Sequence, residues 1–124
     1  MLDGKMVVLV ADDDPAVRDA LKFSLRLEGF EVCACRDGTE LLDHPALMEC
    51  DCILLDHKMP ELSGLDVLRQ LYARDVRAPV IFITGPLTES VRRQAFMAGA
   101  RRVLEKPLLD GVLPEQIREL SAQA

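Results

Sequence analysis

The sequence predicts an α/β protein built on a doubly wound, five-stranded parallel sheet with helices on both faces. Five short apolar runs alternate with five helical patterns, and most connections between them are short, which is typical of successive strand–helix units. Several of the runs end abruptly in polar residues, and right-handed crossovers bring the carboxyl ends of parallel strands to one edge of the sheet. The chain has 124 residues, so we expect residues 1–124 to form a single domain.

The first strand is expected at Met6–Ala11, a continuous apolar run of the kind that is covered on both faces. Asp14 is a natural N-cap and Pro15 suits the first helical position, so a helix is expected from residue 15 to about residue 28, before Gly29. Its apolar face is expected to consist of Val17, Ala20, Leu21, Ser24, Leu25 and Leu27.

A second strand is expected over residues 30–35, followed by a short helix near Thr39 that Pro45 interrupts. The third strand, Cys52–Asp56, cannot continue as a central strand because Pro60 lacks the N–H that the ladder needs. Asp56 is therefore predicted to lie at the carboxyl end of a buried strand. One side of the helix after Gly64 is expected to face the core, and it consists of Leu65, Leu68, Leu71 and Tyr72.

The fourth strand, Val80–Thr84, ends in a hydroxyl group, and a helix is expected over Thr88–Ala98. The fifth strand, Arg102–Glu105, ends at Lys106, and the last helix has Pro114 in its first turn, where a missing donor costs least. The inward residues of the last helix are expected to be Leu113, Ile117 and Leu120.

Composition excludes several classes of protein. With 49% hydrophobic and 29% charged residues, the chain is neither disordered nor membrane-spanning in type, and no apolar run approaches the ~20 residues that a bilayer requires. The N-terminal residues lack the apolar core of a signal peptide, so a cytoplasmic location without membrane attachment is expected. The net charge is −6, and without a basic stripe direct nucleic-acid binding is not expected.

Four cysteines form two C-x-C pairs whose spacing is not that of zinc ribbons. They are predicted to be buried or half-buried reduced thiols that pack as small apolar groups. These residues are Cys33, Cys35, Cys50 and Cys52.

Five polar side chains at strand ends are predicted to meet at one edge of the sheet. Three carboxylates there repel one another, so they hold a proton or bind a cation, and an all-oxygen set favours a hard ion such as Mg²⁺. An ammonium and a hydroxyl group on the far side suit an incoming phosphoryl group. The carboxylate of the third strand is then a candidate nucleophile that forms an aspartyl-phosphate. The five residues are Asp12, Asp13, Asp56, Thr84 and Lys106.

Each of these side chains also has a purely structural alternative. Asp14 is better explained as a helix cap than as a ligand, and Asp12 can share that role. Thr84 alone is an ordinary residue at a strand end, and Lys106 is able to pair with Asp110 at the surface. His57, next to the candidate nucleophile, suggests a general base, but in an extended segment its side chain points to the opposite side.

Four motifs occur in an order and spacing that resemble the receiver domain of two-component response regulators. They are the acidic pair in VADDDP, the D-x-x-M-P-x-x-x-G motif formed by Asp56, Met59, Pro60 and Gly64, the threonine of FITG, and the Lys-Pro of RVLEKP. The resemblance covers essentially the whole chain. It implies a flavodoxin-like sheet with strand order 2-1-3-4-5.

The resemblance implies that Asp56 accepts a phosphoryl group from a sensor histidine kinase or a phosphotransfer protein. Thr84 then follows a phosphoryl oxygen, and Lys106 pairs with the phosphoryl group. The chain is not an enzyme in this interpretation, since it promotes only its own phosphorylation and dephosphorylation.

The resemblance also implies a magnesium site. Asp13 and Asp56 coordinate Mg²⁺ together with the backbone carbonyl of Lys58, and Asp12 assists through water. Lys58 and Pro86, each two residues beyond a site residue, flank the path of an attacking water and tune the lifetime of the phosphoryl group.

One position departs from the family pattern. The Tyr or Phe that usually stands three residues before the lysine is Val103 here, which has few rotamers and no ring to turn inward. We therefore expect the signal to pass by backbone movement of the Thr84–Thr88 loop and the helix after it, changing the surface of the fourth helix and fifth strand.

The implied partners lie outside this chain. No output domain follows residue 124, so a stand-alone or excised receiver is expected, acting on an output domain or effector, for instance in transcription regulation. A homodimer through the fourth helix, fifth strand and fifth helix is a further possibility. Its charges are expected to come from Arg92, Arg93, Arg101, Asp110 and Glu115.

Two other functions compete with this interpretation. A haloacid-dehalogenase-like phosphohydrolase also uses a strand-end aspartate, a threonine and a lysine, and Asp12-x-Asp14 resembles its paired acids. However, Ala16 stands where its first motif has Thr or Val, no acidic pair follows the lysine, and Asp56 has no role in it. The second is a receiver-like interaction domain that works without phosphorylation, against which the intact set of site residues argues.

Overall fold

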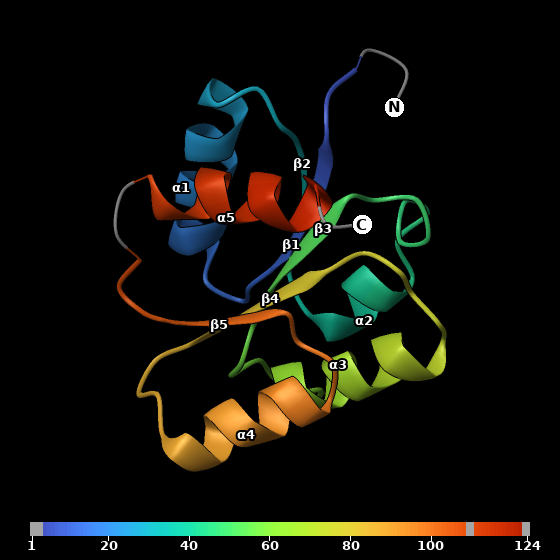
Figure 1. Ribbon diagram of the computed structural model, residues 1–124, viewed down its shortest axis with the longest axis vertical. Coiled ribbons are helices and arrows are strands. Elements are labelled where there is room, and N and C mark those ends of the chain that lie inside the picture. The colour runs from blue at the N-terminus through green and yellow to red at the C-terminus, as the bar shows by residue number, and fades with distance from the viewer. Residues whose placement is uncertain (1–3, 109–110, 123–124) are drawn as a thin grey trace.

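The computed structural model describes residues 4–108 and 111–122, and these form one parallel five-stranded sheet with the order β2-β1-β3-β4-β5. Four helices connect successive strands, and a fifth follows the last strand (Figure 1). The predicted fold class and strand order are confirmed. The elements in chain order are β1 Val7–Ala11, α1 Pro15–Leu27, β2 Glu31–Cys35, α2 Gly38–Leu42, β3 Cys52–Asp56, α3 Gly64–Ala73, β4 Val80–Thr84, α4 Glu89–Met97, β5 Arg102–Glu105 and α5 Val112–Ala122.

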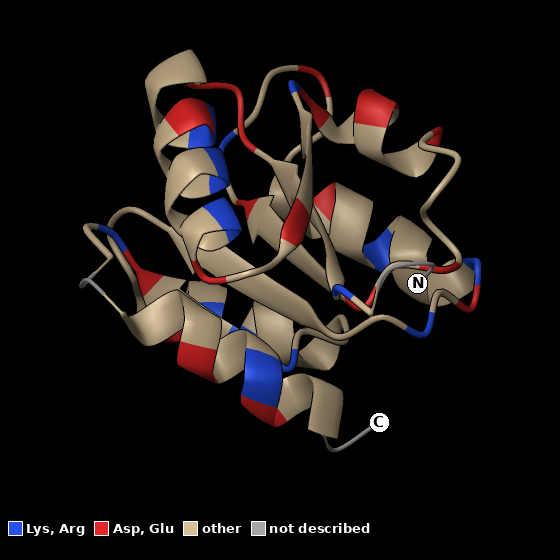
Figure 2. Ribbon diagram, turned by 90° about the horizontal axis from the view of Figure 1, so that it is seen from above, with Lys and Arg blue, Asp and Glu red and all other residues tan. Residues whose placement is uncertain are grey.

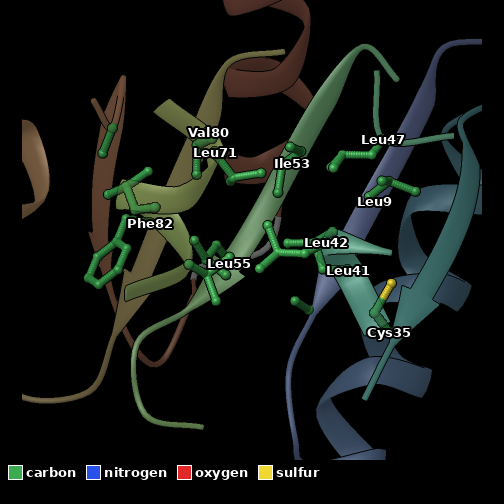
Figure 3. Packing of buried hydrophobic residues seen from close by; sticks show 14 of the residues in the cluster. Leu9, Cys35, Leu41, Leu42, Leu47, Ile53, Leu55, Leu71, Val80 and Phe82 are labelled. Carbon is green, nitrogen blue, oxygen red and sulfur yellow. The ribbon is translucent and has the colours of Figure 1, made fainter. Parts of the chain in front are cut away.

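The helices lie in two layers, with α1 and α5 on one face of the sheet and α2, α3 and α4 on the other (Figure 1). Side chains alternate between these faces along each strand. Leu55 and Phe82 belong to the core on the α2–α3–α4 face, which Figure 3 shows, whereas Leu54 and Ile83 belong to the core on the α1–α5 face. Every residue of β3 and β4 is buried, as expected for central strands of a doubly wound sheet.

Charged residues lie mainly on the helices and loops around a sheet that is drawn mostly tan in Figure 2. No helix in the described part of the chain has both the length and the apolar character needed to cross a bilayer.

Side-chain caps fix where several helices begin. Asp14 accepts a hydrogen bond of 2.9 Å from the backbone N–H of Ala16, and Pro15 occupies the first helical position of α1, as predicted. Ser63 and Asp66 form a capping box at the start of α3, a feature that the sequence analysis did not identify.

Two large apolar residues predicted to face inward are instead exposed: Leu27 by 73% and Tyr72 by 77%. Helix geometry explains both errors. Leu27 is two residues, or about 200°, from the buried Leu25. Tyr72 lies beyond the edge of the face that Val67, Leu68 and Leu71 bury, about 140° from Val67 and about 100° from Leu71. Of the other residues assigned to that face of α1, Ala20 and Ser24 are also exposed.

The four cysteines are free thiols. Cys33 is half-buried and the other three are buried, in agreement with the prediction. Burial raises the pKa of Cys35, Cys50 and Cys52 to about 12 in each case, which keeps these thiols protonated near neutral pH.

Gly64 is required where α3 begins, because the backbone there approaches β3 closely. Its N–H donates a hydrogen bond of 2.6 Å to the carbonyl of His57. A Cβ atom at this position would meet the carbonyl oxygen of Asp56, and it would lie 2.9 Å from His57 Cα and from Phe82 Cε1.

We expect Gly64→Ala to lower the free energy of unfolding by about 1–3 kcal/mol, because two of these three obstacles are backbone atoms that cannot move aside cheaply. Denaturant unfolding measures this change. Gly85→Ala is the matched control, since a Cβ there meets nothing within 4 Å, and it should change stability by about 0.5 kcal/mol or less. Equal stabilities of the two variants would contradict the close-approach argument.

Candidate functional site

The side chains that the sequence assigns to the site stand at the ends of four neighbouring strands. Since β1, β3, β4 and β5 are adjacent and parallel, their carboxyl ends share one edge of the sheet. The residues are Asp12 and Asp13 after β1, Asp56 at the end of β3, Thr84 at the end of β4 and Lys106 after β5.

Three carboxylates form a cluster at this edge. One oxygen from each of Asp12, Asp13 and Asp56 lies within 4.8 Å of the others. Asp12 and Asp56 are only 3% and 6% exposed, while Asp13 is open to solvent. The loop after β1 is held in place by the Asp12 side chain, which accepts the N–H of Asp14 at 2.9 Å, and by Arg18, which donates to the Asp12 carbonyl at 2.8 Å.

Lys106 supplies the positive charge of the cluster. Its Nζ lies 3.0 Å from Asp56 Oδ1 and 3.3 Å from Asp12 Oδ2. Asp110, the alternative partner predicted for Lys106, lies outside the described residues. The structure therefore brings together four of the five predicted side chains: three carboxylates and one ammonium.

Burial and neighbouring charges shift the pKa values of Asp56 and Lys106. Burial raises the pKa of Asp56; the hydrogen bond from Lys106 opposes this change, and the negative charge of Asp12 adds to it. Burial alone lowers the pKa of Lys106, but the hydrogen bond and charge of Asp56, followed by the charge of Asp12, outweigh burial and raise it. The ammonium form of Lys106 is thus favoured among carboxylates that repel one another.

The cluster fits a hard divalent cation. Its side-chain donors are carboxylate oxygens, which Mg²⁺ and Ca²⁺ prefer. When all groups are ionised, three carboxylates and one ammonium carry a formal charge of −2, which one divalent cation balances. Asp13, the exposed member, leaves one side of the cluster open to solvent and to an incoming ligand.

Thr84 is buried, and its hydroxyl group contacts His57, which was not among the predicted site residues. Thr84 Oγ1 lies 3.0 Å from Nδ1 of His57, and the His57 ring packs on Phe82 with 5.2 Å between the ring centroids. Burial, followed by the charge of Lys58, lowers the pKa of His57 and favours the neutral ring. That Thr84 follows a phosphoryl oxygen stays a prediction.

The alternation of side chains explains this pairing. The register of β3 and β4 places Asp56 opposite Ile83, and the N–H of His57 extends the ladder to the Ile83 carbonyl at 2.9 Å. His57 and Thr84 are therefore the next neighbours on the two strands, on the side of Leu55 and Phe82. The Asp56 side chain lies on the opposite face of the sheet, so His57 points away from it, as predicted.

The loop between β4 and α4 has an anchor that sequence reasoning missed. The Glu105 carboxylate at the end of β5 accepts the N–H of Leu87 at 2.9 Å.

The other predicted residues lie around this site. Val103, at the position where the receiver pattern usually has an aromatic residue, is buried and lies opposite Phe82 in the sheet. Lys58 and Pro86 are exposed in the loops after β3 and β4.

Comparisons with known proteins agree with this geometry. A sequence model of the family described as "Response regulator receiver domain" matches residues 8–118. The chain is 36% identical over 118 residues to the response regulator protein TmoT of Ectopseudomonas mendocina, covering 95% of this chain and 54% of that protein. It is 39% identical over 115 residues to the response regulator MprA of Mycobacterium avium, covering 93% and 50%. The chain thus spans about half the length of these curated relatives.

Solved structures give the same result. The crystal structure of FixJ-N superposes with a TM-score of 0.87 at 31% identity and covers 97% of this chain and 96% of that one. The receiver domain of the Francisella response regulator 1452 has a TM-score of 0.90 at 26% identity, covering 96% and 98%. With the family model matching most of the sequence, the chain belongs to the response regulator receiver domains of two-component systems.

Proposed function

We propose that this receiver domain accepts a phosphoryl group on Asp56 from a sensor histidine kinase or a phosphotransfer protein. In this step a carboxylate oxygen of Asp56 bonds to phosphorus while the bond from phosphorus to the donor's histidine nitrogen breaks, and that nitrogen keeps the electron pair. The observation that carries the proposal is the contact of Asp56 with Lys106 at 3.0 Å inside a cluster of three carboxylates.

The surrounding residues have separate parts in the proposed transfer. Lys106 pairs with the phosphoryl oxygens, and Thr84 donates a hydrogen bond to one of them. Asp13, Asp56 and the Lys58 carbonyl would hold Mg²⁺, with Asp12 acting through water. The ion would neutralise charge on the transferred group.

A self-modifying receiver explains the site better than a phosphohydrolase does. In a phosphohydrolase of the haloacid-dehalogenase type, Asp12 and Asp14 would be the paired acids, but Asp14 caps α1 and Asp56 would be idle. We therefore propose that the chain promotes only its own phosphorylation and dephosphorylation, in the cytoplasm, and acts on no separate substrate.

The proposed output is a change at the surface of α4 and β5, read by an output domain or effector, for example in transcription regulation. The loop from Gly85 to Thr88 joins the site to α4 and is anchored to β5 by the contact of Leu87 with Glu105. A homodimer through α4, β5 and α5 would use the same surface. Within it, Arg102 and Gln116 join β5 to α5 at 3.0 Å.

We expect incubation with Mg²⁺ and a small acyl phosphate to add the mass of one phosphoryl group to the wild-type chain and none to Asp56→Asn. Intact-protein mass spectrometry measures the addition, and omission of Mg²⁺ should greatly reduce it. Asp51→Asn is a matched control, since Asp51 bonds the N–H of Val7 at 2.7 Å, at the opposite end of the sheet. Equal modification of wild type and Asp56→Asn would disprove the proposed acceptor.

Lys58→Ala is expected to shorten the half-life of the phosphorylated chain by about threefold, equivalent to about 0.6 kcal/mol in the activation barrier. The reason is that the exposed Lys58 side chain then no longer shields the path of the attacking water. Loss of the phosphoryl mass with time gives the rate. Lys22→Ala, which removes a lysine of α1, is the control, and an unchanged half-life in Lys58→Ala would assign Lys58 to the solvated loop.

Thr84→Val is expected to abolish the changes that phosphorylation causes in the Gly85–Thr88 loop and in α4, because valine cannot donate a hydrogen bond to the phosphoryl group. Amide NMR shifts with and without phosphorylation report these changes. Thr39→Val, an exposed threonine of α2, is the control. A Thr84→Val chain that retained every shift in α4 would show that the signal takes another route.

A further inference from the structure

The contact between His57 and Thr84 is built into the sheet. Both side chains are the first neighbours beyond the paired residues Asp56 and Ile83, both lie on the α2–α3–α4 face, and their polar atoms are 3.0 Å apart. The half-buried His57 ring also packs on the fully buried Phe82, with 5.2 Å between the ring centroids. This ring contact limits the movement of the imidazole that faces Thr84.

Hydrogen-bond capacity makes this contact relevant to the site. A threonine hydroxyl has one proton to donate, whereas a phosphoryl oxygen only accepts. When His57 Nδ1 is the acceptor, the single proton of Thr84 is already used. When Nδ1 is the donor, the hydroxyl oxygen is still held on the α2–α3–α4 face of the sheet. The alternation along β3 places Asp56 on the opposite face, with Leu54.

We propose that His57 is a positioning residue that holds the hydroxyl group of Thr84 on the α2–α3–α4 face while Asp56 is unphosphorylated. Phosphorylation then has to break this contact before Thr84 can donate to the phosphoryl group. His57 therefore opposes the phosphorylated state. This role rests on the proposed function, in which Asp56 carries the phosphoryl group.

The resting contact is tested without any phosphoryl group. In the metal-free chain, ¹⁵N NMR resolves the imidazole nitrogens of His57 and His44, the two histidines of the sequence. Thr84→Val should move the Nδ1 resonance of His57 and leave that of His44, whose Nδ1 accepts the N–H of Ala46 at 3.0 Å, unchanged. An unmoved His57 resonance would overturn the proposal.

The restraining effect is tested with beryllium fluoride and Mg²⁺ as a mimic of the phosphoryl group. His57→Phe keeps a ring on Phe82 and loses the nitrogen, so it should bind the mimic about 2- to 10-fold more tightly, the range expected for one lost hydrogen bond. His57→Asn, whose side-chain amide can occupy the position of Nδ1, should lie closer to wild type. His44→Phe is the matched control and should bind as wild type does.

A double-mutant cycle separates positioning from a general effect of the ring. In the Thr84→Val background, His57→Phe should no longer alter the affinity, since there is no hydroxyl left to hold. A gain in affinity that persists in this background, or no gain in His57→Phe itself, would overturn the proposal. If His57→Phe does not fold, His57→Leu replaces it in the same cycle.

Different results would overturn the proposed function and the restraining role of His57. A wild-type chain that neither binds the mimic nor is modified at Asp56 would overturn the proposed function, and the restraining role with it. A wild-type chain that does both, while His57→Phe binds the mimic with unchanged affinity, would overturn only the role of His57.

Discussion

The site depends on electrostatic repulsion that the fold cannot avoid. A parallel sheet brings its strand ends to one edge, and here two of those ends, of β1 and β3, carry three carboxylates, two of which are almost fully buried. Burying like charges is unfavourable, and one ammonium from Lys106 only partly offsets it. Hydrogen bonds to backbone carbonyls hold the edge in place: the N–H of Gly64 donates to the carbonyl of His57, and the Arg18 side chain donates to the carbonyl of Asp12. The remaining negative charge is what a divalent cation can balance.

Much of this arrangement could be predicted from the sequence because its signals are local. Apolar runs such as VIFIT and CILLD end abruptly, and each ending residue identifies a strand end at the same edge. The boundaries of β3, β4 and β5 are as predicted, and β1 and β2 each begin one residue later than expected. Phe30 is outside β2 because its N–H bonds the carbonyl of Leu25 at the end of α1. The inward faces of the helices were harder to predict, because the buried stripe of α1 is narrower than the spacing of its apolar residues suggests.

What the sequence could not provide is the register between strands. The pairing of His57 with Thr84 follows from Asp56 lying opposite Ile83, and no local pattern specifies that alignment. Alternation along β3 correctly indicated that His57 points away from Asp56, but only the neighbouring strand shows what lies on that other side. The contact of Glu105 with Leu87 has the same origin, because it joins residues of β5 and a loop that are 18 positions apart.

The end of β5 contacts both faces of the sheet through consecutive residues. Glu105 fixes the backbone of the loop before α4 on one face, and Lys106 contacts the buried carboxylates on the other. One short segment of backbone thus joins the two sides of the domain without any side chain passing through the sheet. The backbone that carries the Lys106 ammonium to the acids therefore also carries the Glu105 carboxylate to the Leu87 amide, and this connection does not involve the side chain of Val103, two residues before Glu105.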